Sequence, residues 1–170
     1  MSRKKIYPST LRMNTAGQTL VEVIVATSVV ALVMTAIVAI VTVSVRNTAQ
    51  AKAKALATKY SQEGVEYFRQ KRTDLGWESF YSILAEDGTT FGYCLASLPA
   101  TNNAFQALTQ SSCTASQAVD ARGMFRRDAA VTLSDVLGVQ IISVLVTVRW
   151  QEGTITRESR ASQDFRKATN

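Results

Sequence analysis

The 170-residue sequence contains no histidine, only two cysteines and only two prolines. Zinc in proteins is usually held by histidine and cysteine side chains, so these counts argue against a zinc site, and we expect no metal and no other cofactor. A Gly-rich phosphate loop and a nucleophile elbow are also missing, and acidic pairs such as Glu86-Asp87 are typical of turns. Little is left from which to build catalysis, so the sequence predicts a protein that is not an enzyme.

Charge is missing from one long segment near the N-terminus. The 23 residues from Val23 to Val45 include no charged residue, no glycine and no proline. About 20 such residues span the hydrocarbon core of a bilayer as a helix, so the sequence predicts one membrane helix here.

Acidic residues are missing from the segment that precedes this helix. Four of the 19 Lys and Arg residues lie before Gly17 with no Asp or Glu among them, whereas residues 18–170 carry 15 basic and 13 acidic residues. A basic flank before an apolar span favours an N-terminus in the cytoplasm and export of the chain that follows. We therefore interpret most of the formal charge of +6 as a topology signal rather than a nucleic-acid footprint.

The junction between the basic leader and the apolar segment carries a specific pattern. Gly17 ends the leader, Thr19 and Leu20 follow, and Glu22 places one carboxylate just inside the apolar side. This pattern resembles the prepilin-type N-terminal motif of type IV pilins and of the pseudopilins of type II secretion systems. Gly17, Thr19, Leu20 and Glu22 match that motif in register. Gln18 departs from the Phe or Met that this family usually has after the glycine.

The resemblance implies a processing and assembly pathway. It implies cleavage after Gly17 by a prepilin peptidase, methylation of the new N-terminus at Gln18, and assembly of the mature helix into a filament core. The implied partners are other pilin or pseudopilin subunits, the peptidase, an inner-membrane assembly platform, and membrane lipid before assembly. An inner-membrane precursor would then become part of an extracytoplasmic filament.

The position of Glu22 has a physical interpretation that does not depend on the family. A carboxylate beside a membrane span costs a few kcal/mol to bury unless it is paired or protonated. Cleavage after Gly17 creates a free α-amine four residues away, and the amine of a neighbouring subunit would neutralise Glu22 in a helix bundle. The alternative is an uncleaved signal anchor with Glu22 at the level of the lipid headgroups.

The helical pattern continues beyond the apolar segment. No proline occurs between Pro8 and Pro99, so one helix can run from about Gln18 to about Arg72. Its second half has an apolar face formed by Leu56, Tyr60, Gly64, Tyr67 and Phe68. The basic cluster 69–72 is typical of a helix end.

The rest of the chain predicts a small α+β head. After a break at residues 73–76, an aromatic face indicates a short second helix; it consists of Trp77, Phe80, Tyr81 and Leu84. A short strand then covers residues 89–95, and residues 99–120 are expected to form an irregular loop. The chain thus divides into a leader (1–17), a transmembrane or filament-core half of the long helix (18–46), an amphipathic half (47–73) and a globular head (74–170).

Three more strands are predicted in the last third. Residues 124–133 are compatible with a strand in which Arg127 breaks the alternation, and a turn follows at residues 134–138. The clearest strand alternates Ile142, Val144, Val146, Val148 and Trp150 with more polar residues. A turn at residues 151–153 leads into a return strand over residues 154–162. We expect a long N-terminal helix packed on a small antiparallel sheet, as in pilins.

The two cysteines, Cys94 and Cys113, fall in the part of the chain predicted to be exported, where a disulfide persists. A single disulfide is a plainer account of them than a metal site. If they pair, a closed loop of roughly 20 residues stabilises the head by about 3 kcal/mol.

Three classes of function remain open at this stage. The leading hypothesis is a structural subunit, a minor pilin or pseudopilin. The second is a binding module displayed on such a filament, with Arg122, Arg126 and Arg127 as candidate surface residues for DNA; only Phe125 lies near them as a stacking aromatic, so nucleic acid is the minority alternative. The third, an enzyme on a signal anchor, ranks last.

Overall fold

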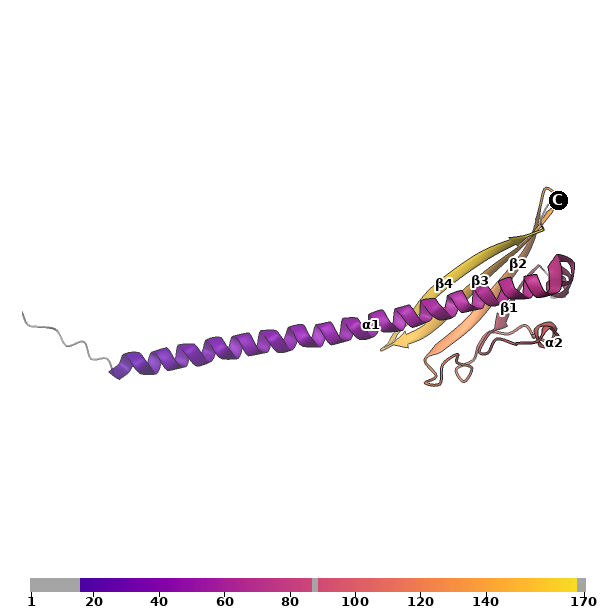
Figure 1. Cartoon of the computed structure of the whole chain (residues 1–170). Coiled ribbons are helices and arrows are strands. Elements are labelled where there is room, and N and C mark those ends of the chain that lie inside the picture. Colours follow the sequence, from indigo (N-terminus) through magenta and orange to yellow (C-terminus); the bar gives the residue numbers. More distant parts are fainter. Residues whose placement is uncertain (1–15, 87–88, 168–170) are drawn as a thin grey trace, which may run out of the picture. The chain divides into compact units, whose positions relative to one another are not determined.

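The computed structural model describes residues 16–86 and 89–167, and of residues 16–18 it describes the backbone only. Its elements are α1 (Ala16–Ala85), β1 (Thr90–Cys94), α2 (Asn102–Gln106), β2 (Phe125–Val136), β3 (Val139–Glu152) and β4 (Ile155–Arg166) (Figure 1). The chain forms two compact units, the first ending at Ala49 and the second beginning at Gln50, and α1 contributes to both. The predicted α+β class is confirmed. Residues 1–15 of the predicted leader lie outside the described residues.

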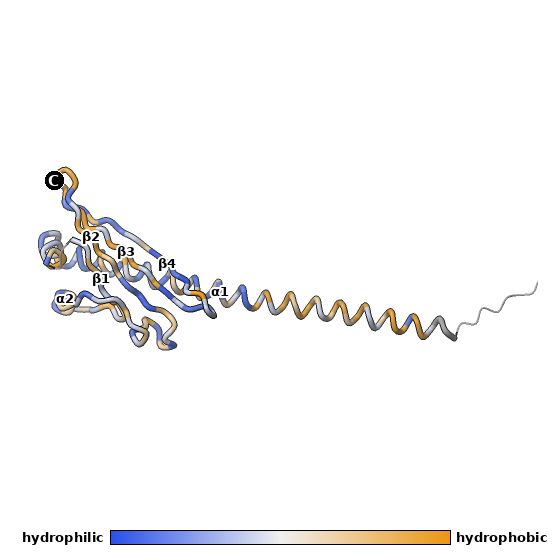
Figure 2. Tube along the Cα trace, turned by 180° about the vertical axis from the view of Figure 1, so that it is seen from behind, coloured by the Kyte–Doolittle hydropathy of each residue, from blue (hydrophilic) through white to orange (hydrophobic). Residues whose placement is uncertain are grey.

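In the first unit, α1 is apolar on all sides. The large apolar side chains from Leu20 to Val45 are each 50–70% exposed, and this part of the helix is mostly orange in Figure 2. Its hydroxyl groups bond to the helix itself; for example, Thr27 Oγ1 donates to the Val23 carbonyl at 2.9 Å and Thr42 Oγ1 to the Val38 carbonyl at 2.8 Å. In the described part of the chain, α1 is the one helix long and apolar enough to cross a membrane.

In the second unit, α1 packs against the sheet through one face. Tyr67 and Phe68 of the predicted apolar face are buried, Gly64 lies in the contact itself, and Leu56 and Tyr60 are partly buried at the edge. A Cβ atom added to Gly64 would lie 2.8 Å from Val146 Cγ1 of β3. Helix and strand therefore meet here at a distance that only a glycine allows.

Replacing Gly64 by alanine should lower the stability of the second unit. The added methyl group would displace the Val146 side chain, and overpacking of this kind costs about 1–3 kcal/mol, which exceeds the gain of roughly 1 kcal/mol in helix propensity. Thermal unfolding monitored by tryptophan fluorescence would detect the change. A Gln62→Ala variant on the exposed side of the same turn is the control, and an equal melting temperature for the two variants would contradict the close contact.

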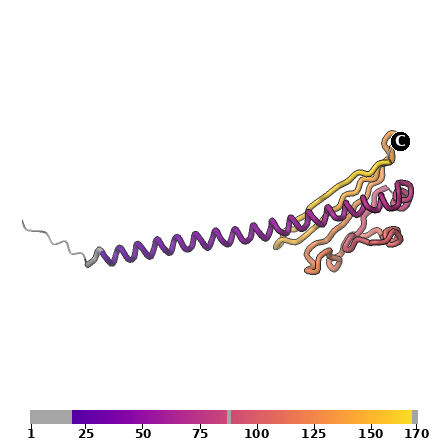
Figure 3. Tube along the Cα trace, viewed as in Figure 1, coloured from indigo at the N-terminus to yellow at the C-terminus, as the bar shows by residue number. Residues whose placement is uncertain are grey.

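The sheet is an antiparallel meander with the strand order β1-β2-β3-β4 (Figure 3). The predicted core strand is confirmed, because the inward side chains of β3 from Ile142 to Trp150 are at most 6% exposed. Two predicted strand ends are wrong. β2 continues to Val136, so the turn lies at residues 137–138, and β4 continues to Arg166. Within the 14 residues of β3, residues 141–150 pair with both β2 and β4. This pairing holds polar residues of β2 and β4 in the sheet.

The predicted break after the long helix is present at a single residue. Gly76 has a φ of 72° and a ψ of 167°, a conformation that interrupts the helical geometry within α1. Beyond it, Phe80 and Leu84 are fully buried, and the Phe80 ring contacts Phe105 of α2 and Phe165 of β4. The aromatic stripe is therefore part of the core.

The segment expected to be wholly irregular contains the short helix α2. Its N-cap is Thr101, whose hydroxyl oxygen accepts a hydrogen bond from Ala104 N. Phe105 is 2% exposed and joins the aromatic core. The prediction missed this helix because one turn is too short to show a hydrophobic period.

Candidate functional sites

The residues of the N-terminal motif lie in the first turns of α1. Gly17 and Gln18 are helical, but their surroundings lie outside what the structure describes. Leu20 is 64% exposed, and Thr19 and Glu22 are exposed as well. None of the ion pairs within the described residues involves Glu22. Its carboxylate therefore still requires a partner if this helix enters an apolar environment.

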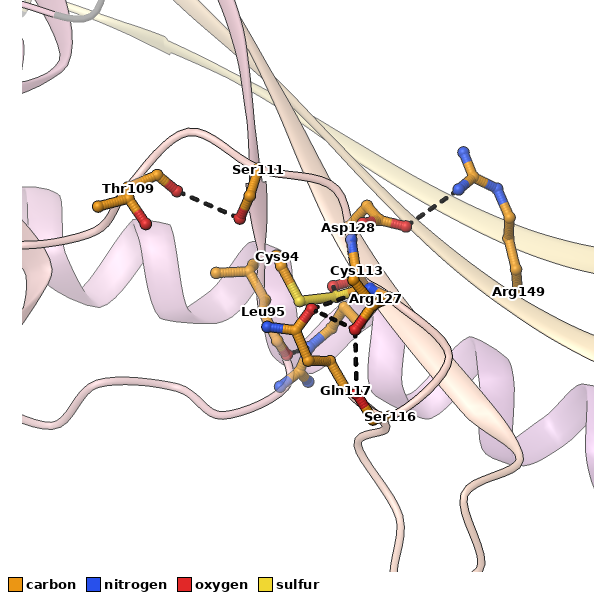
Figure 4. The surroundings of a disulfide bond; sticks show 11 residues. Cys94, Leu95, Thr109, Ser111, Cys113, Ser116, Gln117, Arg127, Asp128 and Arg149 are labelled. Atoms are coloured by element: carbon orange, nitrogen blue, oxygen red, sulfur yellow. Dashed lines mark hydrogen bonds and ion pairs between the residues drawn. A yellow bond between two sulfur atoms is a disulfide. The ribbon is translucent and has the colours of Figure 1, made fainter.

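The predicted disulfide between Cys94 and Cys113 is present (Figure 4). It joins the end of edge strand β1 to the segment that follows α2. The same segment is held to β2 because Cys113 N donates to Asp128 Oδ1 at 2.7 Å, and Asp128 is in turn paired with Arg149 of β3 at 3.0 Å. The disulfide thus fixes an otherwise irregular segment on the edge of the sheet.

Removal of this disulfide should destabilise the second unit. Its half-cystines are separated by 19 residues, and a closed loop of that size restricts the unfolded chain by about 3 kcal/mol. Denaturant unfolding of a Cys94→Ser/Cys113→Ser variant would measure the loss. A reductant should destabilise the wild type but leave the double variant unchanged; equal effects on both would contradict the assignment.

The three arginines proposed as a surface group are not brought together. Arg122 is exposed, and Arg126 pairs across the strands with Arg149 on the outer side of the sheet. Arg127 is only 2% exposed and faces α1, so its prediction as a surface-binding residue is wrong. Because side chains alternate along a strand, Arg126 and Arg127 necessarily point to opposite faces.

Arg127 ties three separate segments together inside the second unit. Its Nε donates to the Leu95 carbonyl at 3.0 Å and its Nη1 to the Tyr60 carbonyl at 3.2 Å, while Glu63 Oε2 lies 3.6 Å from Nη1. Burial lowers the pKa of Arg127, and the charge of Glu63 opposes that shift. The guanidinium group therefore links segments of the core by hydrogen bonds and is not a ligand site.

A groove lies beside α1 in the same unit. It has a volume of about 370 Å³ and is lined by the segment Leu98, Pro99 and Ala100 and by five residues of the helix: Glu63, Glu66, Tyr67, Gln70 and Lys71. Lys71, which belongs to the basic cluster predicted at a helix end, is only 2% exposed.

The ammonium group of Lys71 is held by neutral groups. Its Nζ donates to Ala100 O at 2.8 Å and to Asn102 Oδ1 at 3.1 Å, and it lies 5.6 Å from the centre of the Tyr67 ring. No carboxylate of the described residues forms an ion pair with it. A buried cation without a counter-ion is unusual, because burial disfavours charge.

The buried hydroxyl group of Tyr67 should make the folded protein less stable at high pH. It is buried without a hydrogen-bond partner, and burial raises its pKa to about 12. The unfolded chain therefore loses this proton near pH 10 while the folded chain keeps it, so stability falls as the pH rises from about 10 to 12. A Tyr67→Phe variant should show a smaller fall, and should be more stable by about 1–2 kcal/mol at neutral pH because an unsatisfied hydroxyl is removed. Urea unfolding of both proteins at pH 7, 10 and 11 would show identical pH dependence if the hydroxyl were solvated.

Comparisons with known proteins identify no relative of this chain. No protein-family model matches the chain, and no curated protein or solved structure is significantly similar to it.

Proposed function

We propose that the protein is a structural subunit, a minor pilin or pseudopilin, of an extracytoplasmic filament of the type IV pilus kind. The observation that carries this proposal is the motif Gly17 to Glu22 at the start of a helix that is apolar on all sides for more than 20 residues. An α+β unit with a disulfide follows the same helix. A prepilin peptidase would cut after Gly17, and the amine of Gln18 would become the new N-terminus.

The physical role of α1 in this proposal is to exchange one apolar environment for another. Before assembly, lipid surrounds the exposed side chains between Leu20 and Val45, with the N-terminus in the cytoplasm. After extraction, the helices of neighbouring subunits surround them. Burial against helices replaces burial in lipid, so the free-energy difference is small and an assembly machine can drive the exchange. Glu22 would then find its counter-charge in a neighbour's N-terminal amine.

The structure gives less support to a DNA-binding function. Of the three candidate arginines, only Arg122 and Arg126 are outside the core, and Arg149 beside them is already paired with Asp128. Single-strand binding combines basic residues with exposed aromatics, and Phe125 is 2% exposed. We therefore keep the structural role as the proposal.

Cell fractionation tests the proposal directly. Cells that produce the chain are sheared, filaments are collected from the medium, and the protein is detected there and in the membrane fraction with an antibody against the second unit. We expect it in both fractions, with the filament fraction free of an integral membrane protein used as a marker. Detection in the membrane alone, under conditions in which filaments are recovered, would contradict the filament role.

A further inference from the structure

Every charged residue between Glu22 and Glu63 is basic, and all of them are exposed. They are Arg46, Lys52, Lys54 and Lys59. Lys59 lies 3.7 Å from Glu63, but none of the ion pairs among the described residues involves Lys52 or Lys54. Two cations without an internal counter-ion therefore lie at the start of the second unit, which begins at Gln50.

The β3–β4 hairpin lies at the same end of the second unit. Val146 of β3 lies against Gly64 of α1. Trp150, four residues later in the strand, belongs to the cluster against which Ala53 packs. Because Ala53 precedes Gly64 in α1, β3 runs toward the start of the unit, and its turn into β4 lies at the end of the sheet away from the C mark (Figure 1). Ile155, directly after this turn, is 55% exposed.

The two lysines lie on either side of the contact between helix and sheet at this end. Ala53, the residue between them, packs toward the sheet, and successive residues of an α-helix are about 100° apart around its axis. The acids in this half of the sheet are each paired with an arginine; they are Asp128, Glu152 and Glu158. The surface therefore combines a net positive charge with one exposed apolar side chain.

A membrane surface is within reach of these lysines when α1 spans a bilayer. The apolar segment ends at Val45, and Lys52 follows seven residues later. Seven residues cover about 10 Å as a helix and no more than about 25 Å when fully extended. The headgroup region adds roughly 5–7 Å on each side of the hydrocarbon core, and a lysine side chain is long and flexible. The connection alone therefore keeps Lys52 near the headgroups.

We propose that this end of the second unit docks on a membrane surface that contains anionic phospholipid. The ammonium groups of Lys52 and Lys54 approach lipid phosphate groups, and Ile155 enters the boundary between headgroups and acyl chains. Each basic residue near an anionic surface strengthens binding roughly fivefold, so the two lysines together contribute about 25-fold. The inference rests on the proposed function only in requiring α1 to span the membrane. Extraction into a filament must break this contact, so anionic lipid favours the unassembled subunit.

Dye fluorescence of the full-length chain in lipid vesicles tests this contact. Thr154→Cys, beside Ile155, provides a single free thiol for the dye, because the two native cysteines form the disulfide. The vesicles consist of phosphatidylcholine with or without phosphatidylglycerol, and some headgroups in both leaflets carry a nitroxide quencher, so either orientation of the chain is detected. We expect severalfold stronger quenching with phosphatidylglycerol, and high salt should remove the difference because it screens the charges.

Two charge variants and a second dye position serve as controls. Lys52→Gln/Lys54→Gln should remove most of the additional quenching. Arg166→Gln/Lys167→Gln removes two cations at the opposite end of the sheet and should keep it. A dye at Leu137→Cys should remain unquenched in both kinds of vesicle, because this residue is 100% exposed at the β2–β3 turn, at the far end of the unit.

The outcomes separate this contact from the filament role. Equal quenching in both kinds of vesicle overturns the contact, and so does an equal loss in the two double variants, which would show a response to net charge alone. A chain that alkaline carbonate removes from the vesicles refutes the membrane span on which the contact rests. The vesicles contain no peptidase and no filaments, so a failure here leaves the filament role intact. Absence of the chain from sheared filaments refutes that role and leaves the lipid contact standing.

Discussion

Replacing Arg127 by methionine should lower the free energy of unfolding of the second unit by about 2–4 kcal/mol. Methionine fills most of the space but offers no donor, so the buried Leu95 carbonyl loses the hydrogen bond from Nε, and Glu63 loses its partner on β2. Glu63 is still half exposed and remains solvated. The main cost is therefore the unsatisfied carbonyl and the lost link between β2, α1 and Leu95, the residue that follows β1.

The neighbouring residue provides a matched control for this variant. Arg126 lies one position earlier on the opposite face of β2, directly across from Arg149. Arg126→Met should change stability by less than about 1 kcal/mol, because it removes a like-charge pair and no described hydrogen bond. Urea unfolding followed by tryptophan fluorescence measures both variants. If Arg126→Met proved as damaging as Arg127→Met, the inward orientation of Arg127 would be wrong.

Replacing Glu22 by alanine should abolish filament incorporation while leaving cleavage intact. The peptidase recognises the residues around Gly17 in this proposal, whereas Glu22 acts later, as the counter-charge for a neighbour's amine. A protonated N-terminus buried without that carboxylate is an unpaired charge, which costs about 3–5 kcal/mol and reduces incorporation more than a hundredfold. Immunoblots of sheared filaments and membranes would show mature protein retained in the membrane.

Two further variants separate charge from other effects at this site. Glu22→Gln keeps the size and polarity of the side chain, so it should fail as Glu22→Ala does if charge is the decisive property. Thr27→Ala removes a hydroxyl that bonds only to its own helix, and it should assemble normally. Normal incorporation of Glu22→Ala would refute the counter-charge role.

Buried faces could be predicted where apolar residues repeat at a short, regular spacing along the sequence. β3 was recognised with its correct buried face, because the alternation of Ile142, Val144 and Val146 is a local pattern. The buried face of α1 followed equally from the spacing of Tyr67 and Phe68 with Gly64. The pairing of Cys94 with Cys113 followed from the absence of any other cysteine.

Features that depend on distant segments were not predictable from local patterns. Arg127 is buried because Tyr60 of α1 and Leu95, the residue after β1, supply acceptors for it. Lys71 is buried because Ala100 and Asn102 supply acceptors for its ammonium group. β4 extends to Arg166 because β3 continues beside it. In the candidate assembly site, the motif is contiguous in the sequence and could be recognised from it, whereas the partner that we propose for Glu22 would belong to another molecule.

The N-terminal residue of the protein extracted from membranes or filaments tests the central claim most directly. Cleavage by a prepilin peptidase would leave a chain that begins at Gln18, with mass spectrometry also reporting a methyl group on its α-amine. We expect this start in the filament fraction and in most of the membrane fraction. A chain that retains Met1, or that begins at any residue other than Gln18, would contradict the account.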